Sequence, residues 1–463
     1  MVTITSSYTV FPSEPTPKIP MWLSESDQIH GWSHAPSIYV YKPNHVNSSN
    51  PIERMRSSLS KILVHYYPLA GRLRWIGGGR LEVDCNAKGV QLLEAESTKE
   101  MAEYGDFEPT HTIKDLVPKI DIYSTPIEDL PLLVVQLTRF SCSGLCVGVS
   151  ISHTMVDGLS AIHFINSWAK LARGDILEEK ELPFLDRTVF KSFEPLISPR
   201  FEHKELTDVP IILGCSDTIL ERKKETSATL LRLTKEQVNK LKEKANQGRS
   251  SMVISSPSQR PYTRFEAIAG HMWRCASKAR LGDHHGIANE QKLHQPTVVR
   301  FPADIRNRLN PPLPANYFGN AILRTVTPTR FFGDIVSNPL SYSAQSIRGA
   351  IETMTEEYLR SQLDFITSQK NVDWLRNSFQ TLECMKQTFY GNPNMAIGSW
   401  MSLPVYEANF GWGKPIYMGP ASLNADGKSY IMPHPDADGS LIIALRLQTL
   451  HMEAFTKFFY DDI

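Results

Sequence analysis

Hydrophobic and polar positions along the chain follow two periods. Alternation predicts a strand at 36–42. Strand-like runs on either side of turn residues predict a hairpin across 69–85 that turns at Gly77–Gly79, and a second hairpin across 131–153 that turns near Ser143–Gly144. Apolar steps of three and four predict helices over 51–66 and from Leu159 onward, with Gly174 suited to the position just past the helix end. The first half therefore mixes strands with amphipathic helices.

The second half repeats this mixture. Thr234 with Gln237, and Thr263 with Glu266, have the spacing of capping boxes and predict a helix start at each threonine. A loop is predicted at 247–261, which is rich in Ser, Pro and Gln, and a connector at 176–225, where prolines recur. The mixture of elements predicts an α/β protein, and 463 residues suffice for two or three domains.

Composition narrows the choice of partners. Lys+Arg and Asp+Glu both number 49, and no basic arm is present, so nucleic acid is not expected and an anionic substrate would need a local patch. No apolar run is long enough to span a membrane, and the N-terminus lacks the features of a secretory signal. We expect a cytoplasmic protein with reduced thiols and no metal site, because its six cysteines are scattered: Cys85, Cys142, Cys146, Cys215, Cys275 and Cys384.

The pattern His-x-x-x-Asp occurs three times. The copies at 111–115 and 434–438 are expected in a surface loop and in a hairpin loop, where turn chemistry explains their residues. The third, "SISHTMVDG", places His153 at the end of a strand that is apolar on both faces, just before a helix. His153 can be a general base or a core histidine that hydrogen-bonds to the backbone, and its position alone favours neither. No serine or cysteine elbow accompanies it, so a base here would activate the acceptor substrate directly.

The sequence resembles the plant BAHD acyltransferases, which use acyl-coenzyme A. The resemblance covers nearly the whole chain and rests on five strings in order: "YPLAGRL" (67–73), "HTMVDG" (153–158), "AGHMWRC" (269–275), "YFGN" (317–320) and "NFGWGKP" (409–415). A peptide-synthetase condensation domain also uses His-x-x-x-Asp-Gly, but usually with a doubled histidine, and Ser152 precedes His153 here. A binding protein without catalysis is disfavoured because His153 and Asp157 are both present.

The resemblance implies an α/β fold of two chloramphenicol-acetyltransferase-like domains. Each would be a mixed β-sheet covered by helices, with a solvent channel between them, in a monomer. The implied boundaries are 1–198 for the N-terminal domain, 199–225 for a crossover connector and 226–463 for the C-terminal domain. A segment near 380–405 is a candidate to pair with the N-terminal sheet.

The resemblance also implies roles for residues. His153 would be the base, with Asp157 as structural support paired to Arg306, and Trp412 would donate to the oxyanion or pack the domain junction. Asn409, Gly411 and Gly413 would be structural, although the family usually has Asp where Asn409 stands. Acyl-CoA would be a co-substrate, with no cofactor, and its binding would involve Thr263 and Arg264 at a helix start.

The acceptor implied by the opening segment is a polyamine such as spermidine, acylated on its amines by a hydroxycinnamoyl group. Shikimate and quinate enzymes resemble the chain closely too, but they carry an arginine where Ser402 stands, and a hydroxyl cannot replace a guanidinium. O-acylation of shikimate, quinate or another alcohol is the alternative. The candidate acceptor-binding residues are Ser37, Tyr39, Ser402 and Glu407.

Overall fold

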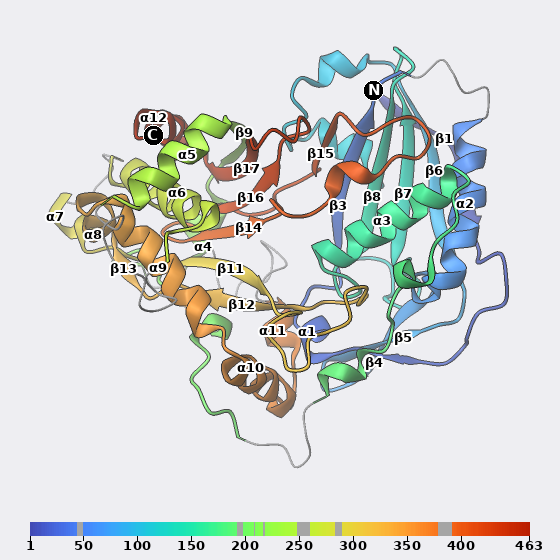
Figure 1. The fold of residues 1–463 in the computed structure, drawn as a ribbon, viewed down its shortest axis with the longest axis horizontal. Helices are drawn as coiled ribbons and strands as arrows, with labels where there is room; N and C mark the ends of the chain where they lie inside the picture. The colour runs from blue at the N-terminus through green and yellow to red at the C-terminus, as the bar shows by residue number, and fades with distance from the viewer. Residues whose placement is uncertain are drawn as a thin grey trace.

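Two six-stranded mixed sheets form the centre of the computed structural model (Figure 1). The structure describes residues 1–43, 50–191, 198–207, 209–215, 218–247, 260–282, 289–377 and 391–463. Most of the predicted loop 247–261 and part of the predicted connector lie outside these ranges. Figure 1 shows the elements from the two halves of the chain gathered largely on opposite sides of the molecule.

The N-terminal sheet has the order β1-β6-β7-β8-β3-β15, and only β6 and β7 run parallel. Both predicted hairpins are present, one as β4–β5 in a small sheet with β2 and one as β7–β8 in the large sheet. The strands are β1 (Val2–Val10), β2 (Met21–Trp22), β3 (His34–Tyr41), β4 (Arg72–Gly77), β5 (Arg80–Asp84), β6 (Val90–Ser97), β7 (Leu133–Arg139), β8 (Leu145–Ser152) and β15 (Tyr417–Pro420).

Strand β8 is the centre of this half. Every residue of β8 is buried, as its continuous apolar pattern predicts. Helices α2 (Pro51–His65) and α3 (Gly158–Ala172) pack their apolar stripes on one face of the sheet. Helix α3 ends where the sequence predicts, because Gly174 adopts φ +91°, which glycine tolerates without strain. The segment between β8 and α3 is therefore a short turn fixed at both ends.

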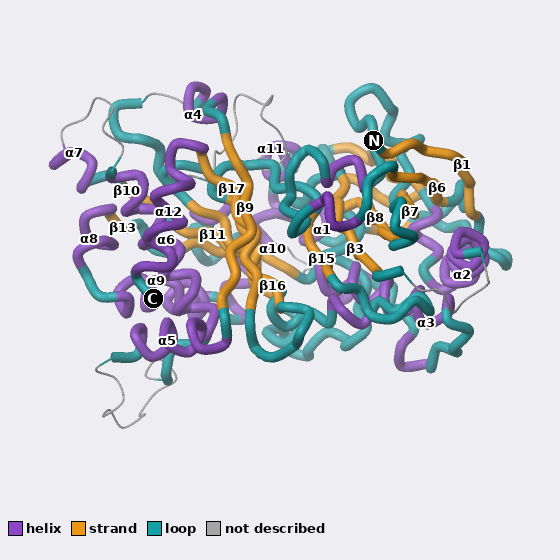
Figure 2. The backbone as a smooth tube through the Cα atoms, turned by 90° about the horizontal axis from the view of Figure 1, so that it is seen from above, coloured by secondary structure: helices purple, strands orange, loops and turns teal. Residues whose placement is uncertain are grey.

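The C-terminal sheet has the order β12-β11-β14-β16-β17-β9, with β14 parallel to both of its neighbours. Helices α5 (Lys235–Ala245), α6 (Arg264–Leu281), α9 (Leu340–Thr353) and α12 (Thr449–Asp461) share one core cluster with it, and Figure 2 shows them gathered on one side of the strands. The strands are β9 (Thr226–Leu233), β11 (Val299–Asp304), β12 (Ile322–Val326), β14 (Met395–Ser399), β16 (Lys428–Pro433) and β17 (Leu441–Gln448); β10 (Pro296–Thr297) and β13 (Arg330–Phe331) pair separately.

Both predicted capping boxes are present in this half. The side chain of Thr234 caps α5, and that of Thr263 caps α6. The remaining α-helices of the described residues are short, apart from α10. Their bounds are α1 (Glu25–Gln28), α4 (Ile219–Lys223), α7 (Asn289–Leu293), α8 (Phe332–Ser337), α10 (Glu356–Ser368) and α11 (Asp373–Asn377).

The strand expected to cross between the halves lies elsewhere in the described residues. β15 leaves the C-terminal half and pairs with β3 in the N-terminal sheet, whereas the expectation placed such a strand near 380–405. Within that segment, β14 belongs to the C-terminal sheet, while 378–390 lies outside the described residues. The residue pattern of a four-residue strand does not say which sheet edge it will meet. The domain boundaries at 198 and 226 stay a prediction.

Candidate active site

His153 lies in the turn after β8, at the junction of the two halves. Its backbone N–H donates to the Ser33 carbonyl at 3.1 Å, and its ring stacks on His30 with centroids 4.5 Å apart and planes 8° apart. The ring is partly exposed, so it is not walled into the interior. Nδ1 is enclosed by protein and makes no regular hydrogen bond, which leaves Nε2 as the nitrogen that can meet a substrate.

The surroundings of His153 keep its ring neutral. Burial lowers the pKa of His153 below its ordinary value, and the positive charge of Lys428 lowers it further. Its own backbone carbonyl, Asp157 and Asn320 act in the opposite direction without reversing the shift. Burial and the neighbouring His153 place the pKa of His30 well below its ordinary value too. A neutral imidazole is the form that can accept a proton.

Asp157 supports the turn and does not reach the imidazole. Its carboxylate caps α3 by accepting from Ser160 N at 2.9 Å, and it accepts from Ala321 N at 2.9 Å. Arg306 donates to both of its oxygens, at 2.8 and 3.0 Å, with both side chains almost fully buried. The predicted pairing of Asp157 with Arg306 is confirmed. Because these donors occupy both carboxylate oxygens, no proton relay from Asp157 to the His153 ring is in place.

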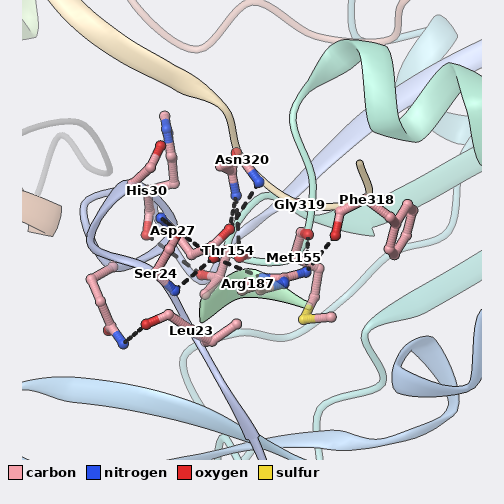
Figure 3. Close-up of polar contacts among 12 residues, drawn as sticks. Leu23, Ser24, Asp27, His30, Thr154, Met155, Arg187, Phe318, Gly319 and Asn320 are labelled. Atoms are coloured by element: carbon pink, nitrogen blue, oxygen red, sulfur yellow. Dashed lines mark hydrogen bonds and ion pairs between the residues drawn. The ribbon is translucent and has the colours of Figure 1, made fainter. Parts of the chain in front are cut away.

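A second buried ion pair holds the same turn from its other side. Asp27 pairs with Arg187 at 2.9 Å, and Arg187 donates to the Met155 carbonyl at 2.8 Å. Asn320 donates to Asp27 at 2.9 Å and to the backbone carbonyl of His153 at 2.9 Å. Figure 3 shows Asp27, Arg187 and Asn320 converging on this turn. Sequence reasoning missed this network, although "YFGN" contains Asn320 and "SESD" is a capping box that contains Asp27.

Trp412 does not lie beside His153. Its ring is 8% exposed and packs at the edge of Tyr41, with centroids 5.4 Å apart, in the core under α2 and α3. Asn409 orders this loop, since its amide oxygen accepts from Gly411 N at 2.9 Å and Gly413 N at 3.0 Å. Both glycines adopt left-handed backbone angles that disfavour other residues, φ +98° and +93°. The loop is thus structural, and a packing role for Trp412 fits it better than donation to an oxyanion.

A different tryptophan, Trp400, is adjacent to the turn that contains His153 and Asp157. The indole nitrogen of Trp400 lies 3.7 Å from the point where a Cβ on Gly158 would stand, directly after Asp157. Its ring is partly exposed and stacks on Tyr430 with centroids 4.6 Å apart. No hydrogen bond of this N–H to another described residue is found. Trp400 is therefore better placed than Trp412 to donate to a substrate oxygen.

The candidate acceptor residues differ in burial and in pairing. Ser37 and Tyr39 lie on the strand beside β8, and Tyr39 is buried in the core with its pKa raised by that burial. Ser402 is exposed. Glu407 forms an ion pair with Lys414 at 2.7 Å, and its side chain is 57% exposed. The carboxylate expected to bind a polyamine is therefore already paired at the surface.

The two candidate CoA residues differ in availability. The Thr263 hydroxyl is engaged in its capping box with Glu266, which is itself fixed by the buried Arg348. Arg264 is exposed and makes no hydrogen bond or ion pair with the part of the chain that is described. Of the two side chains, only that of Arg264 is free for a phosphate at this helix start.

The other sequence expectations concern residues outside the site. His111 is exposed, and His434 lies in the β16–β17 hairpin loop, as predicted. Cys85, Cys146 and Cys275 are buried, Cys142 is partly exposed and Cys215 is exposed, while Cys384 lies outside the described residues. Within the described ranges, no cluster of side chains is arranged to hold a metal ion, and no helix is both long and apolar enough to cross a membrane.

A comparison with family models places the chain in the class of acyl-CoA-dependent acyltransferases. A family model described as the Transferase family matches residues 1–462, and the chain belongs to this family, the BAHD acyltransferases. Members of the family take the acyl group from a coenzyme A thioester, which is a co-substrate.

Two curated relatives are similar to the chain over its full length. It is 47% identical to hydroxycinnamoyl-CoA:piscidic acid hydroxycinnamoyltransferase of Actaea racemosa, with 100% of each chain covered. It is 38% identical to shikimate O-hydroxycinnamoyltransferase of Nicotiana tabacum, with 99% of each covered. The crystal structure of F. graminearum TRI101 complexed with coenzyme A and T-2 mycotoxin matches with a TM-score of 0.74 at 17% identity, covering 94% of this chain and 96% of that one. The predicted two-domain α/β fold is confirmed.

Proposed function

We propose that the protein transfers a hydroxycinnamoyl group from coenzyme A to a hydroxyl group of a small hydroxy acid, with His153 as the general base. The observation that carries this proposal is the partly exposed His153 ring, which burial and Lys428 keep neutral at the junction of the two sheets. The full-length relatives support the donor and the acid class of acceptor, since their names specify hydroxycinnamoyl transfer to piscidic acid and to shikimate.

In this reaction Nε2 of His153 accepts the proton of the acceptor hydroxyl as its oxygen attacks the thioester carbonyl. The tetrahedral intermediate then collapses, the carbon–sulfur bond breaks, and the imidazolium returns the proton to the coenzyme A thiolate. A donor to the oxyanion is worth about 3–4 kcal/mol in such reactions. Trp400 is our candidate for that donor, in place of Trp412.

Acylation of a polyamine is the alternative that the opening segment of the sequence suggests. It requires carboxylates that bind ammonium groups near the base, and Glu407 is paired with Lys414 at the surface instead. Among the charged groups that shift the pKa of His153, the cation of Lys428 has the largest effect. These surroundings favour an anionic acceptor over a cationic one.

A competition assay tests the proposal. The purified protein is incubated with p-coumaroyl-CoA and equal concentrations of piscidate, shikimate and spermidine, and the products are separated by mass. We expect p-coumaroyl esters of one or both acids, and their loss with His153→Ala. Spermidine amides as the only products would overturn the acid acceptor, and undiminished turnover by His153→Ala would overturn the role of the base.

A further inference from the structure

Lys428 is the first residue of β16 and lies at the end of a row of aromatic side chains that leads to the catalytic turn. Its ammonium stands 5.5 Å from the centre of the Tyr430 ring, which is two residues further on the same face of the strand. Tyr430 stacks on Trp400, and the Trp400 indole nitrogen approaches Gly158. The row therefore connects Lys428 with the residue that follows Asp157.

The Lys428 ammonium has no counter-ion in the part of the chain that the structure describes. Its only direct partner there is the face of Tyr430, and the side chain is partly buried. Two other partly buried lysines pair with carboxylates, Lys170 with Glu181 and Lys278 with Asp462. Lys99, like Lys428, lies over a tyrosine ring, that of Tyr104. A cation near a partly desolvated site gains most from an anionic ligand, because the local dielectric is lower than in water.

The charge of Lys428 lies within electrostatic reach of the base, since it is one cause of the lowered pKa of His153. This proximity limits which anion can reach it. The negative charges of coenzyme A lie on its nucleotide end, and a long, neutral pantetheine arm separates them from the thioester. When the thioester is at His153, the acceptor is the substrate that can present a carboxylate near Lys428.

We propose that Lys428 binds the carboxylate of the acceptor acid and so makes the enzyme selective for anionic acceptors. This inference rests on the proposed function, because it presupposes acyl transfer to a hydroxy acid at His153. Ser402 is exposed and neutral, so it does not supply the positive charge that such a carboxylate needs. The Tyr430 ring supports the lysine stem and aims its ammonium by a cation–π contact.

The test compares each acid with its neutral ester. Lys428→Met removes the charge at similar length, Lys428→Arg keeps it, and Lys240→Met removes an exposed lysine on α5 as the matched control. Each variant is assayed with p-coumaroyl-CoA and either shikimate or piscidate, or their methyl esters. The assay is run at about pH 8, where the His153 ring is neutral in every variant.

We expect Lys428→Met to raise the KM for the acid that the protein uses by about tenfold to a hundredfold, the effect of one hydrogen bond to a charged group. The KM for p-coumaroyl-CoA and the turnover of the methyl ester should stay within about twofold, the scatter of surface substitutions. Lys428→Arg should retain most of the affinity for the acid, and Lys240→Met should behave as the wild type.

Two results would overturn the role of Lys428 while leaving the proposed function intact. An equal loss for acid and ester would show that Lys428 acts on the reaction itself, and a raised KM for p-coumaroyl-CoA alone would place coenzyme A against it. By contrast, a wild-type protein that acylates neither acid nor ester refutes the proposed function before any variant is made.

Discussion

Replacing Asp157 by asparagine should destabilise the protein far more than the loss of a helix cap does. The substituted side chain would still cap α3, since asparagine and aspartate are comparable at this position. It would lose the charge that pairs with Arg306, which stays buried. Removing one partner of a buried ion pair costs about 3–5 kcal/mol. Asp304, 3.4 Å from Arg306 and half exposed, retains part of the pairing, so we expect about 3 kcal/mol.

Urea unfolding followed by tryptophan fluorescence measures this cost. Thr355→Ala is the matched control, because it removes only the cap bond to Tyr358 N on α10, at about 1 kcal/mol. The double variant Asp157→Asn/Arg306→Gln removes both charges and should recover part of the loss, since the unpaired guanidinium accounts for most of it. Equal midpoint shifts for Asp157→Asn and Thr355→Ala, or a double variant with simply additive losses, would refute the reasoning.

Turnover by the folded Asp157→Asn variant distinguishes a structural role of Asp157 from a role in proton relay. Replacing an aspartate that is hydrogen-bonded to a catalytic imidazole lowers turnover by about four orders of magnitude. No such bond exists here, so we expect a smaller loss in the fraction that remains folded. The acidic limb of kcat/KM should shift to lower pH, because the negative charge of Asp157 favours the protonated ring of His153.

Further predictions concern the base, the motif loop and one buried histidine. His153→Ala should lower kcat/KM by about 10²–10⁴-fold with an unchanged circular dichroism spectrum. The kcat/KM of the wild type should fall on acidification with an apparent pKa below 6.5, and Lys428→Met should move that pKa upward, because a cation that disfavours the imidazolium is removed. Asn409→Asp should leave kcat/KM within about twofold, since a carboxylate oxygen can accept the same two N–H bonds. Burial is the main cause that lowers the pKa of His271 to about 4. The neutral ring therefore contributes its full share of the unfolding free energy above pH 6.5, and this share is lost as the pH drops towards 4. That loss, measured as unfolding free energy, should be about 3 kcal/mol, and it should be smaller in His271→Gln.

Local chemistry is what the sequence predicts well. The start of α3, its glycine end and the two capping boxes each depend on residues within a few positions of one another. The hairpins around Ser143–Gly144 and Gly77–Gly79 depend on a turn between two strand-like runs. Such features need no knowledge of the distant chain, so their residue patterns are sufficient.

Contacts between distant segments explain what the sequence did not predict. Arg187 lies in a stretch that its prolines mark as a connector, and nothing near it points to Asp27 as its partner. β15 has too few residues for its pattern to select a sheet edge. The sequence pattern around Lys428 predicts only the polar end of a strand. The tertiary fold is what brings its charge towards His153. The Asp157–Arg306 pairing was the exception, because the resemblance to a family specified it.

The electrostatics of the turn bear on which acceptor chemistry is feasible. A carboxylate that accepted a hydrogen bond from Nδ1 would raise the pKa of His153 and make it a stronger base. Asp157 does not do so, because Arg306 contacts both of its carboxylate oxygens. A free polyamine carries ammonium groups with pKa values near about 10, and an imidazole whose pKa is lowered is poorly matched to remove their protons. The Lys428 charge also repels an incoming ammonium and attracts a carboxylate. A hydroxyl needs no prior deprotonation, since its proton can pass to His153 as its oxygen attacks the thioester, so the same weak, neutral base suits a hydroxy acid better than a polyamine.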